Sequence, residues 1–103
     1  MYTSTMRYEF KIDKFAEACE IWENKVLALA AKQPGFVRMQ FLVQPDKGIA
    51  LAIGTWESQI AAQNFMKTGV FKDLLEDLKD FSLSQPQPEI WVLKYYRSLI
   101  VPD

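Results

Sequence analysis

Polar and apolar residues alternate along residues 6–12, which predicts a β-strand with one apolar face formed by Met6, Tyr8, Phe10 and Ile12. Apolar residues recur at helical spacing over the next segment and predict a helix with one buried stripe: Phe15, Ala18, Cys19, Trp22, Val26 and Leu29. Asp13 precedes this stripe and is expected to cap the helix. The pair Pro34-Gly35 is expected to end it.

Two further strands are predicted over residues 36–43 and 48–56, joined by a tight turn at residues 44–47. A four-residue turn at this place predicts that large side chains lie opposite small ones: Phe41 opposite Ala50, Met39 opposite Ala52, and Val37 opposite Gly54. Helices could pack closely over such a surface, and Trp56 would point to the same side of the sheet.

A second helical region is predicted after the hairpin. Ser58 is expected to cap its first helix, and Gly69 is expected to interrupt it. A new apolar stripe at helical spacing then follows: Phe71, Leu74, Leu75, Leu78 and Phe81. Residues 85–88 read as a proline-containing linker, and residues 89–96 as the last strand.

The order β-α-β-β-α-β predicts an α+β fold of the ferredoxin-like, split βαβ type, as a single domain over residues 1–103. This fold has a four-stranded antiparallel sheet with both helices on one face. The other face is then uncovered, and it would present the apolar side chains of Leu42, Ile49, Leu51 and Ile53. A second copy of the chain is the simplest cover, so we expect a homodimer.

Charge and composition exclude several classes of protein. The formal net charge is −1, and acidic and basic residues are mixed along the chain, so neither nucleic acid nor a membrane surface is an expected partner. No run approaches the roughly 20 apolar residues of a membrane span. Cys19 is the sole cysteine, which excludes an intrachain disulfide and favours a cytoplasmic location.

The chain contains no histidine, so it lacks the commonest general base and the commonest metal or haem ligand. A phosphate-binding loop, a nucleophile elbow, paired carboxylates and a cluster of metal ligands are also absent from the sequence. We therefore expect no metal site and no bound cofactor.

Short motifs resemble the antibiotic biosynthesis monooxygenase (ABM) group of dimeric α+β barrels. They are Gln33-Pro34-Gly35-Phe36 before the second strand, and Thr55-Trp56-Glu57-Ser58 followed by Phe71. The resemblance implies a homodimer whose two sheets face each other as an eight-stranded barrel. Some members oxidise polycyclic phenols with O₂ and no cofactor, and others degrade haem. Members often carry histidine where this chain has Phe65 and Val70, which makes haem degradation improbable.

The candidate site follows from these motifs. Trp56, Asn64 and Arg38 are the candidate catalytic residues, and the candidate substrate-binding residues are Tyr8, Trp22, Phe65, Trp91 and Tyr95. Each has a plain structural alternative. The tryptophans and Phe65 can be core, Asn64 can face solvent, the tyrosines can pack at an interface, and Arg38 can pair with Glu9 across the sheet, which we favour.

Two functions fit the sequence. One is a cofactor-independent monooxygenase for a small aromatic or quinol-type substrate, in which the substrate anion itself reduces O₂. The other is a non-catalytic homodimeric barrel that binds a small apolar ligand. The fold alone does not decide between them. A polar group aimed into the pocket would favour the first, and a pocket closed by apolar side chains would favour the second.

Overall fold

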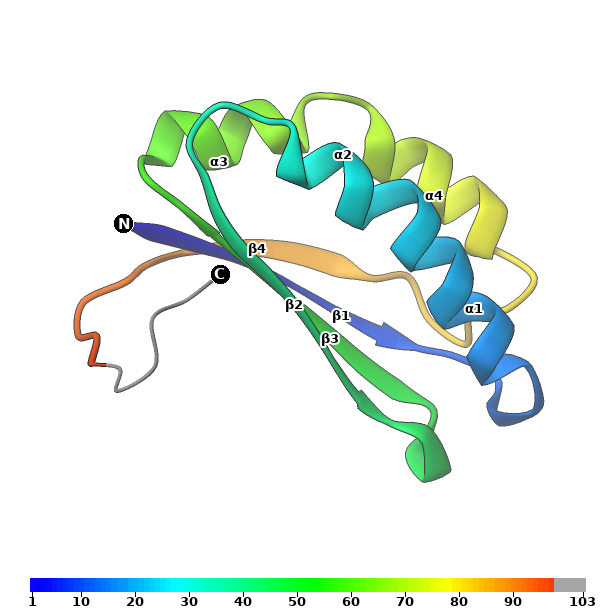
Figure 1. Ribbon diagram of the computed structural model, residues 1–103. Coiled ribbons are helices and arrows are strands. Elements are labelled where there is room, and N and C mark those ends of the chain that lie inside the picture. The colour runs from blue at the N-terminus through cyan, green and yellow to red at the C-terminus, as the bar shows by residue number, and fades with distance from the viewer. Residues whose placement is uncertain (98–103) are drawn as a thin grey trace.

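The computed structural model describes residues 1–97 of the chain. They form one four-stranded antiparallel sheet with helices on one face (Figure 1). The strands lie in the order β2-β3-β1-β4, with these bounds: β1 Tyr2–Glu9, β2 Phe36–Gln44, β3 Ile49–Trp56 and β4 Gln87–Val92. Strands β1 and β3 each begin one βαβ half. They lie side by side in the sheet although β2 comes between them in the sequence. The expected ferredoxin-like α+β fold is confirmed.

Strand β1 begins earlier and ends earlier than the alternation predicts. It runs from Tyr2 to Glu9, and its buried side chains are Ser4, Met6 and Tyr8. Phe10 is also buried, but Ile12 is 60% exposed and lies in the short 3-10 helix η1, Ile12–Lys14. The alternation in the sequence runs on to Ile12, but the chain turns away from the sheet after Phe10. The strand is therefore shorter than the alternating pattern.

The hairpin register differs from the predicted one by two residues. Phe41 lies opposite Ala52, Met39 opposite Gly54, and Val43 opposite Ala50. The connection is the 3-10 turn η3, Pro45–Lys47, closed by Gly48 in the left-handed conformation at φ 70°. Gly48 therefore belongs to the loop rather than to the strand. A shift of two residues preserves the face of every side chain, so large residues still lie opposite small ones.

The first helical segment is continuous but not uniform. It consists of α1 Phe15–Trp22, the π-helical turn η2 Glu23–Leu27, and α2 Ala28–Ala31. Asp13 does not cap it, contrary to the prediction. The residue at the N-cap is Lys14, it makes no side-chain capping hydrogen bond, and Asp13 lies within the preceding 3-10 turn.

The second helical segment is divided as predicted. Helix α3, Gln59–Met66, begins after Ser58, whose Oγ accepts a hydrogen bond from the Ala61 backbone N–H at 3.1 Å. Gly69 then adopts φ 86° and precedes α4, Val70–Leu78. The positive φ angle favours glycine at this position and separates the two helices.

The last strand is displaced toward the N-terminus. Strand β4 covers Gln87–Val92, whereas residues 93–97 form no regular structure. The predicted strand therefore ended too late, and the prolines of the predicted linker flank or enter it. An edge strand can accept Pro88 because it needs hydrogen bonds on one side only.

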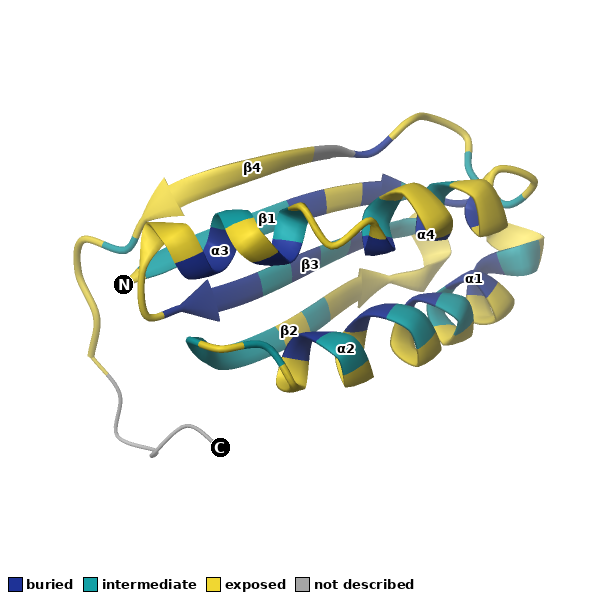
Figure 2. Ribbon diagram, turned by 90° about the horizontal axis from the view of Figure 1, so that it is seen from above, coloured by how far each residue is buried: buried dark blue, intermediate teal, exposed yellow. Residues whose placement is uncertain are grey.

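The core lies between the helices and one face of the sheet. Figure 2 shows the buried positions of the helices turned toward the sheet, with the largely exposed β4 at one edge. Aromatic rings are stacked through this layer, including Tyr8 on Phe10 at 5.4 Å and Trp22 on Phe41 at 4.1 Å between ring centroids. Nearly all of the large buried side chains therefore belong to the helix-covered face.

The opposite face of the sheet has no helix over it (Figure 1). The alternation along β2 and β3 places an apolar set on this open face: Leu42, Ile49, Leu51 and Ile53. Leu42 is 48% exposed, and the other three are partly exposed. The predicted division of the sheet into a packed face and an open apolar face is confirmed.

Removing the Ser58 cap is expected to weaken α3. Ser58→Ala leaves the Ala61 N–H without its acceptor and should lower the free energy of unfolding by about 1 kcal/mol. Urea unfolding followed by circular dichroism measures this change. Ser84→Ala, at an exposed position after the helices, is the matched control. Equal unfolding midpoints for both variants would show that the cap contributes nothing.

Candidate functional site

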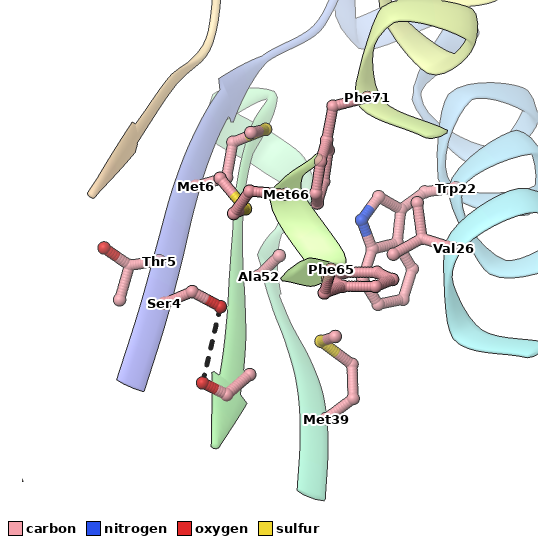
Figure 3. A pocket seen from close by; sticks show the side chains of 11 residues that line it. Ser4, Thr5, Met6, Trp22, Val26, Met39, Ala52, Phe65, Met66 and Phe71 are labelled. Atoms are coloured by element: carbon pink, nitrogen blue, oxygen red, sulfur yellow. Dashed lines mark hydrogen bonds between the residues drawn. The ribbon is translucent and has the colours of Figure 1, made fainter. Parts of the chain in front are cut away.

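A small cavity lies between the helices and the sheet (Figure 3). Its volume is about 10 Å³, which is room for about one water molecule. Three methionines and three aromatic residues supply most of its wall: Met6, Met39, Met66, Trp22, Phe65 and Phe71. These side chains come from two strands and three helical elements, so both the sheet and the helices that cover it contribute to the wall of the cavity.

Strand β3 forms the floor of the cavity, on the sheet side, and its side chains there are small. Ala52 and Gly54 both line it. A Cβ atom at Gly54 would lie 3.0 Å from Ser4 Oγ, 3.1 Å from Met39 Cε and 3.1 Å from Trp56 Nε1. Glycine at position 54 therefore allows three side chains to approach the same point.

Trp56 is fully buried beside this floor, and its polar group is already engaged. Its indole N–H donates to Ser4 Oγ at 3.2 Å, and the Ser4 hydroxyl in turn faces the Gly54 carbonyl oxygen at 3.5 Å. The Trp56 ring packs against Phe65 at 4.9 Å between centroids. Trp56 thus supports the cavity wall, and its N–H is directed to a protein oxygen.

Tyr8 and Trp22 carry polar atoms that are buried without a hydrogen-bond partner. Tyr8 is 0% exposed and Trp22 is 2% exposed, and neither the Tyr8 hydroxyl nor the Trp22 indole N–H makes a hydrogen bond within the protein. Burial raises the pKa of Tyr8, and a side-chain hydrogen bond with Trp22 lowers it by a smaller amount. The indole N–H therefore lies beside the Tyr8 hydroxyl, in a contact that falls short of ordinary hydrogen-bond geometry.

Of the candidate residues, Trp22 and Phe65 line the cavity, whereas Tyr8, Trp56 and the remaining candidates do not. Asn64 is exposed on α3, and Tyr95 is 82% exposed beyond β4. Trp91 is 52% exposed, and its N–H donates to Thr5 Oγ1 at 2.9 Å on the open face. The sequence prediction therefore combined residues that the fold separates.

Arg38 lies on the open face as well. Its guanidinium is 5.6 Å from the centre of the Tyr96 ring, and its Nε is buried without a hydrogen-bond partner. The favoured ion pair with Glu9 is wrong. Strand β3 separates β1 from β2, and Glu9 pairs instead with Arg7 at 2.8 Å.

Sequence reasoning missed several residues of the cavity wall. Ser4 lay outside the predicted first strand, although its place two residues before Met6 continues the alternation. Met39 was recognised as facing the helices but not as lining a site. The sequence signal that could have located the floor of the cavity was the pairing, in the hairpin, of small residues on β3 with large residues on β2.

The cavity wall offers hydrogen-bond donors but no proton acceptor of suitable basicity. None of its lining residues has a carboxylate, an imidazole or an amine. Among residues 1–97, no three His, Cys, Asp or Glu side chains gather closely enough to hold a metal ion. None of the helices in this part of the chain combines the length and apolar content of a membrane span. The arrangement can desolvate and orient an apolar ligand, and it can donate hydrogen bonds.

The burial of Tyr8 predicts a loss of stability at alkaline pH. Its folded-state pKa lies above the usual value of 10.0, so above pH 10 the unfolded chain releases a proton that the folded chain retains. The free energy of unfolding should then fall by up to about 1.4 kcal/mol per pH unit above pH 10. Below pH 9, Tyr8 should add no pH dependence to the free energy of unfolding. Tyr8→Phe should remove this slope, as measured by urea unfolding between pH 8 and 11.

Tyr95→Phe is the control for this measurement because its exposed hydroxyl is in water in either state. An identical alkaline slope in Tyr8→Phe and the unaltered protein would show that the hydroxyl is hydrated in the folded state.

Solved structures of similar fold include proteins with an assigned activity and one without. A variant of SnoaB, a cofactor-independent oxygenase from Streptomyces nogalater, is 22% identical, with a TM-score of 0.76 over 92% of this chain and 94% of that one. A monooxygenase of Streptomyces coelicolor, in complex with nanaomycin D, is 18% identical, with a TM-score of 0.72 over 99% and 92%. A Nitrosomonas europaea protein of unknown function is 16% identical, with a TM-score of 0.76 over 94% and 93%.

At these identities the structural likeness establishes the fold. No curated protein matches the chain by sequence. The family described as antibiotic biosynthesis monooxygenase matches residues 1–77, which hold β1 to β3, α1 to α3 and nearly all of α4. The protein therefore belongs to the antibiotic biosynthesis monooxygenase family.

Proposed function

We propose that the protein is a cofactor-independent monooxygenase that binds a small aromatic or quinol-type substrate between its helices and its sheet. The supporting observation is the apolar cavity between Trp22, Met39 and Phe65, with the Trp22 indole N–H buried at its wall. Its volume of about 10 Å³ admits one water molecule, so binding of a ring requires the flexible side chains of Met39 and Met66 to move aside. The family and the fold shared with two oxygenases support the same assignment.

The proposed reaction needs little from the protein. A phenol such as 1-naphthol supplies four electrons to one O₂: one oxygen atom enters the ring to give a quinone, and the other leaves as water with the two hydrogens that the substrate loses. The phenolate form is the reductant. The protein supplies a site that excludes water and orients the ring, and N–H and O–H donors that stabilise oxygen anions.

Within this proposal the candidate residues take different roles. Trp22 and Phe65 form the wall that holds the aromatic ring. Tyr8 is buried in the same layer but does not line the cavity. Trp56 acts on the ligand indirectly, by holding Phe65 and Ser4 in place. Asn64, exposed on α3, has no part in the cavity described here.

A second function is favoured by one specific observation, the absence of a proton acceptor from the cavity wall. A barrel that binds a small apolar ligand without turnover needs no such group. The two functions differ in oxygen consumption, because both predict binding of an aromatic ligand and only the oxygenase predicts that O₂ is used.

Filling the cavity should abolish ligand binding. Ala52→Val adds two methyl groups at the floor, so 1-naphthol should no longer raise the melting temperature, and any oxygen uptake above the rate without protein should disappear. Ala50→Val is a matched control, because Ala50 is a buried residue of the same strand and face that does not line the cavity. Each substitution is expected to cost about 1–3 kcal/mol of stability through overpacking.

Differential scanning fluorimetry and an oxygen electrode measure the two effects. A melting shift without oxygen uptake in the unaltered protein would favour the non-catalytic barrel. If neither naphthols nor naphthalene shift the melting temperature, a ligand-binding role for this cavity is wrong.

We further propose that the protein works as a homodimer joined through the open face of the sheet. Leu42, Ile49, Leu51 and Ile53 form an apolar surface there. Arg38 and Trp91 lie on the same face, and they would contribute to the contact rather than to the cavity. Stable interfaces of this type bury on the order of 2,000 Å² or more.

Leu51→Arg should disrupt the dimer, because it places a charge at the centre of the apolar surface. Sedimentation velocity should then report a monomer or an unfolded chain. Ile60→Arg, which is 68% exposed on the helical side, makes the same change away from the proposed contact and should leave the dimer intact. A well-folded monomer of the unaltered protein at micromolar concentration would contradict the dimer.

A further inference from the structure

The cavity is too small to hold an aromatic ring as it stands. Its volume is about 10 Å³, whereas pockets that bind drug-sized ligands measure roughly 300 Å³ or more. Rotation of the Met39 and Met66 side chains supplies part of this difference, and the rest requires a segment of the wall to move. The segment that moves at the lowest free-energy cost is the one that buries the least apolar surface.

Helix α3 buries smaller side chains than the first helical segment or α4. Its buried residues are two alanines and one aromatic ring, Ala61, Ala62 and Phe65. The other two segments bury larger side chains, among them Phe15, Trp22, Val26, Leu74 and Leu78. Helix α3 should therefore separate from the sheet more readily than either of them.

Polar contacts between elements follow the same division. Asp77 of α4 pairs with Lys25 of the π-helical turn at 2.8 Å, which joins the two longer helical segments to each other. Within residues 1–97, no ion pair and no side-chain hydrogen bond joins α3 to another helix or to a strand. Packing alone holds α3 on the sheet.

The two ends of α3 are fixed to different degrees. Before its start, the Glu57 N–H donates to the Gly35 carbonyl oxygen at 2.8 Å, and a Cβ atom at Gly35 would lie 2.6 Å from Ala61 Cβ. After its end, residues 67–69 are exposed, and a Cβ atom at Gly69 would meet no atom of residues 1–97 within 4 Å. The start of α3 can therefore serve as a pivot, while its end has room to move.

One side chain connects the mobile end of α3 to the next helix. Thr68 Oγ1 donates to the Phe65 carbonyl oxygen at 2.8 Å and accepts from the Val70 N–H at 3.4 Å. Figure 3 shows Phe65 and Met66, the last two residues of α3, within the wall of the cavity. Movement of this end would therefore uncover the cavity, and Thr68 opposes that movement.

We propose that α3 is a lid on the cavity. Its C-terminal end, with Phe65 and Met66, swings away from the sheet about the contact between Ala61 and Gly35, and the Thr68 hydroxyl is the latch that holds it down. This inference rests on the proposed function in taking an aromatic molecule as the ligand that enters, whereas the opening is a property of the protein without ligand. It adds the route by which a ring reaches the floor at Ala52.

Thiol labelling of the native protein with iodoacetamide measures the opening. Ala52→Cys places a thiol on the cavity floor, and Ala50→Cys places one on the same strand and face outside the cavity. Both are made with Cys19→Ala, because the natural thiol is partly exposed. Urea unfolding of each variant gives the labelling rate that global unfolding alone allows. Relative to that rate, the thiol at position 52 should react at least about tenfold faster than the thiol at position 50.

The latch is tested by two variants that each remove one hydroxyl. Thr68→Ala should raise the labelling rate at position 52 about three- to tenfold, which corresponds to one hydrogen bond that is broken when the lid opens. Ser82→Ala is the matched control, because Ser82 Oγ donates to the Leu78 carbonyl oxygen at 2.9 Å and this bond at the end of α4 stays intact in the open state. It should leave the rate at position 52 unchanged while lowering global stability.

The outcomes separate the lid from the proposed function. Equal relative rates at positions 52 and 50 would overturn the lid, because the cavity would then open only by global unfolding. Equal acceleration by Thr68→Ala and Ser82→Ala would overturn it for the same reason. Saturating 1-naphthol should slow labelling at position 52 by occupying the cavity. Rapid labelling there that 1-naphthol does not slow would uphold the lid and reject ligand binding in this cavity.

A second pair of positions serves if either cysteine variant of β3 does not fold. Met6→Cys replaces Ala52→Cys, because Met6 is buried and lines the cavity. Leu74→Cys replaces Ala50→Cys, because Leu74 is buried on α4 and does not line it. The same difference in relative labelling rate is expected, and its absence would overturn the lid.

Discussion

The close approach of small residues on β3 to large residues on the strand beside it is the constraint on which the remaining structure depends. Ala50, Ala52 and Gly54 lie opposite Val43, Phe41 and Met39. The small residues let the helices come near the sheet, and the large ones fill the space beside them, with Phe41 stacked under Trp22. The cavity lies over Ala52 and Gly54, where this interlocking is incomplete, and a Cβ atom at Gly54 would already lie close to Ser4, Met39 and Trp56.

The same arrangement divides the molecule into two faces with different chemistry. The covered face holds nearly all of the core and the cavity, and its polar groups are few: Ser4, Tyr8, Trp22 and Trp56. The open face holds the polar and charged candidates that could stabilise an anion, Arg38 among them. A residue two positions along a strand stays on its face, whereas a residue one position along changes face, so the fold itself prevents Arg38 and Trp56 from acting on one ligand within a protomer.

The sequence predicted the fold class, the two faces of the hairpin, the Ser58 cap and the break at Gly69, because each depends on a local pattern or on a single side chain. It failed where the chain had two local solutions. Gly48 could begin a strand or close a turn, and its left-handed conformation, which moved the register by two residues, is not visible in a pattern of apolar positions. The separation of Arg38 from Glu9 depended on strand order, which alternation along one strand does not contain. The sequence also does not show which buried polar atoms find hydrogen-bond partners, because that depends on side-chain orientation across three elements. The Trp56 indole N–H makes a hydrogen bond with Ser4, whereas the Trp22 indole N–H has no partner of suitable geometry.

That difference between the two tryptophans bears on the chemistry available to the cavity. Trp56 gives its N–H to Ser4 and thereby holds a fixed wall, whereas the Trp22 N–H and the Tyr8 hydroxyl are buried with no hydrogen bond of ordinary geometry. A site with donors and no base can lower the energy of an oxygen anion but cannot create one by removing a proton. Any oxidation in this cavity must then start from a substrate that ionises without help from the cavity wall, and the pH dependence of the reaction would follow the pKa of the substrate. The protein's contribution would lie in the orientation of the ring and the exclusion of water, both of which the packing of β3 against the helices provides.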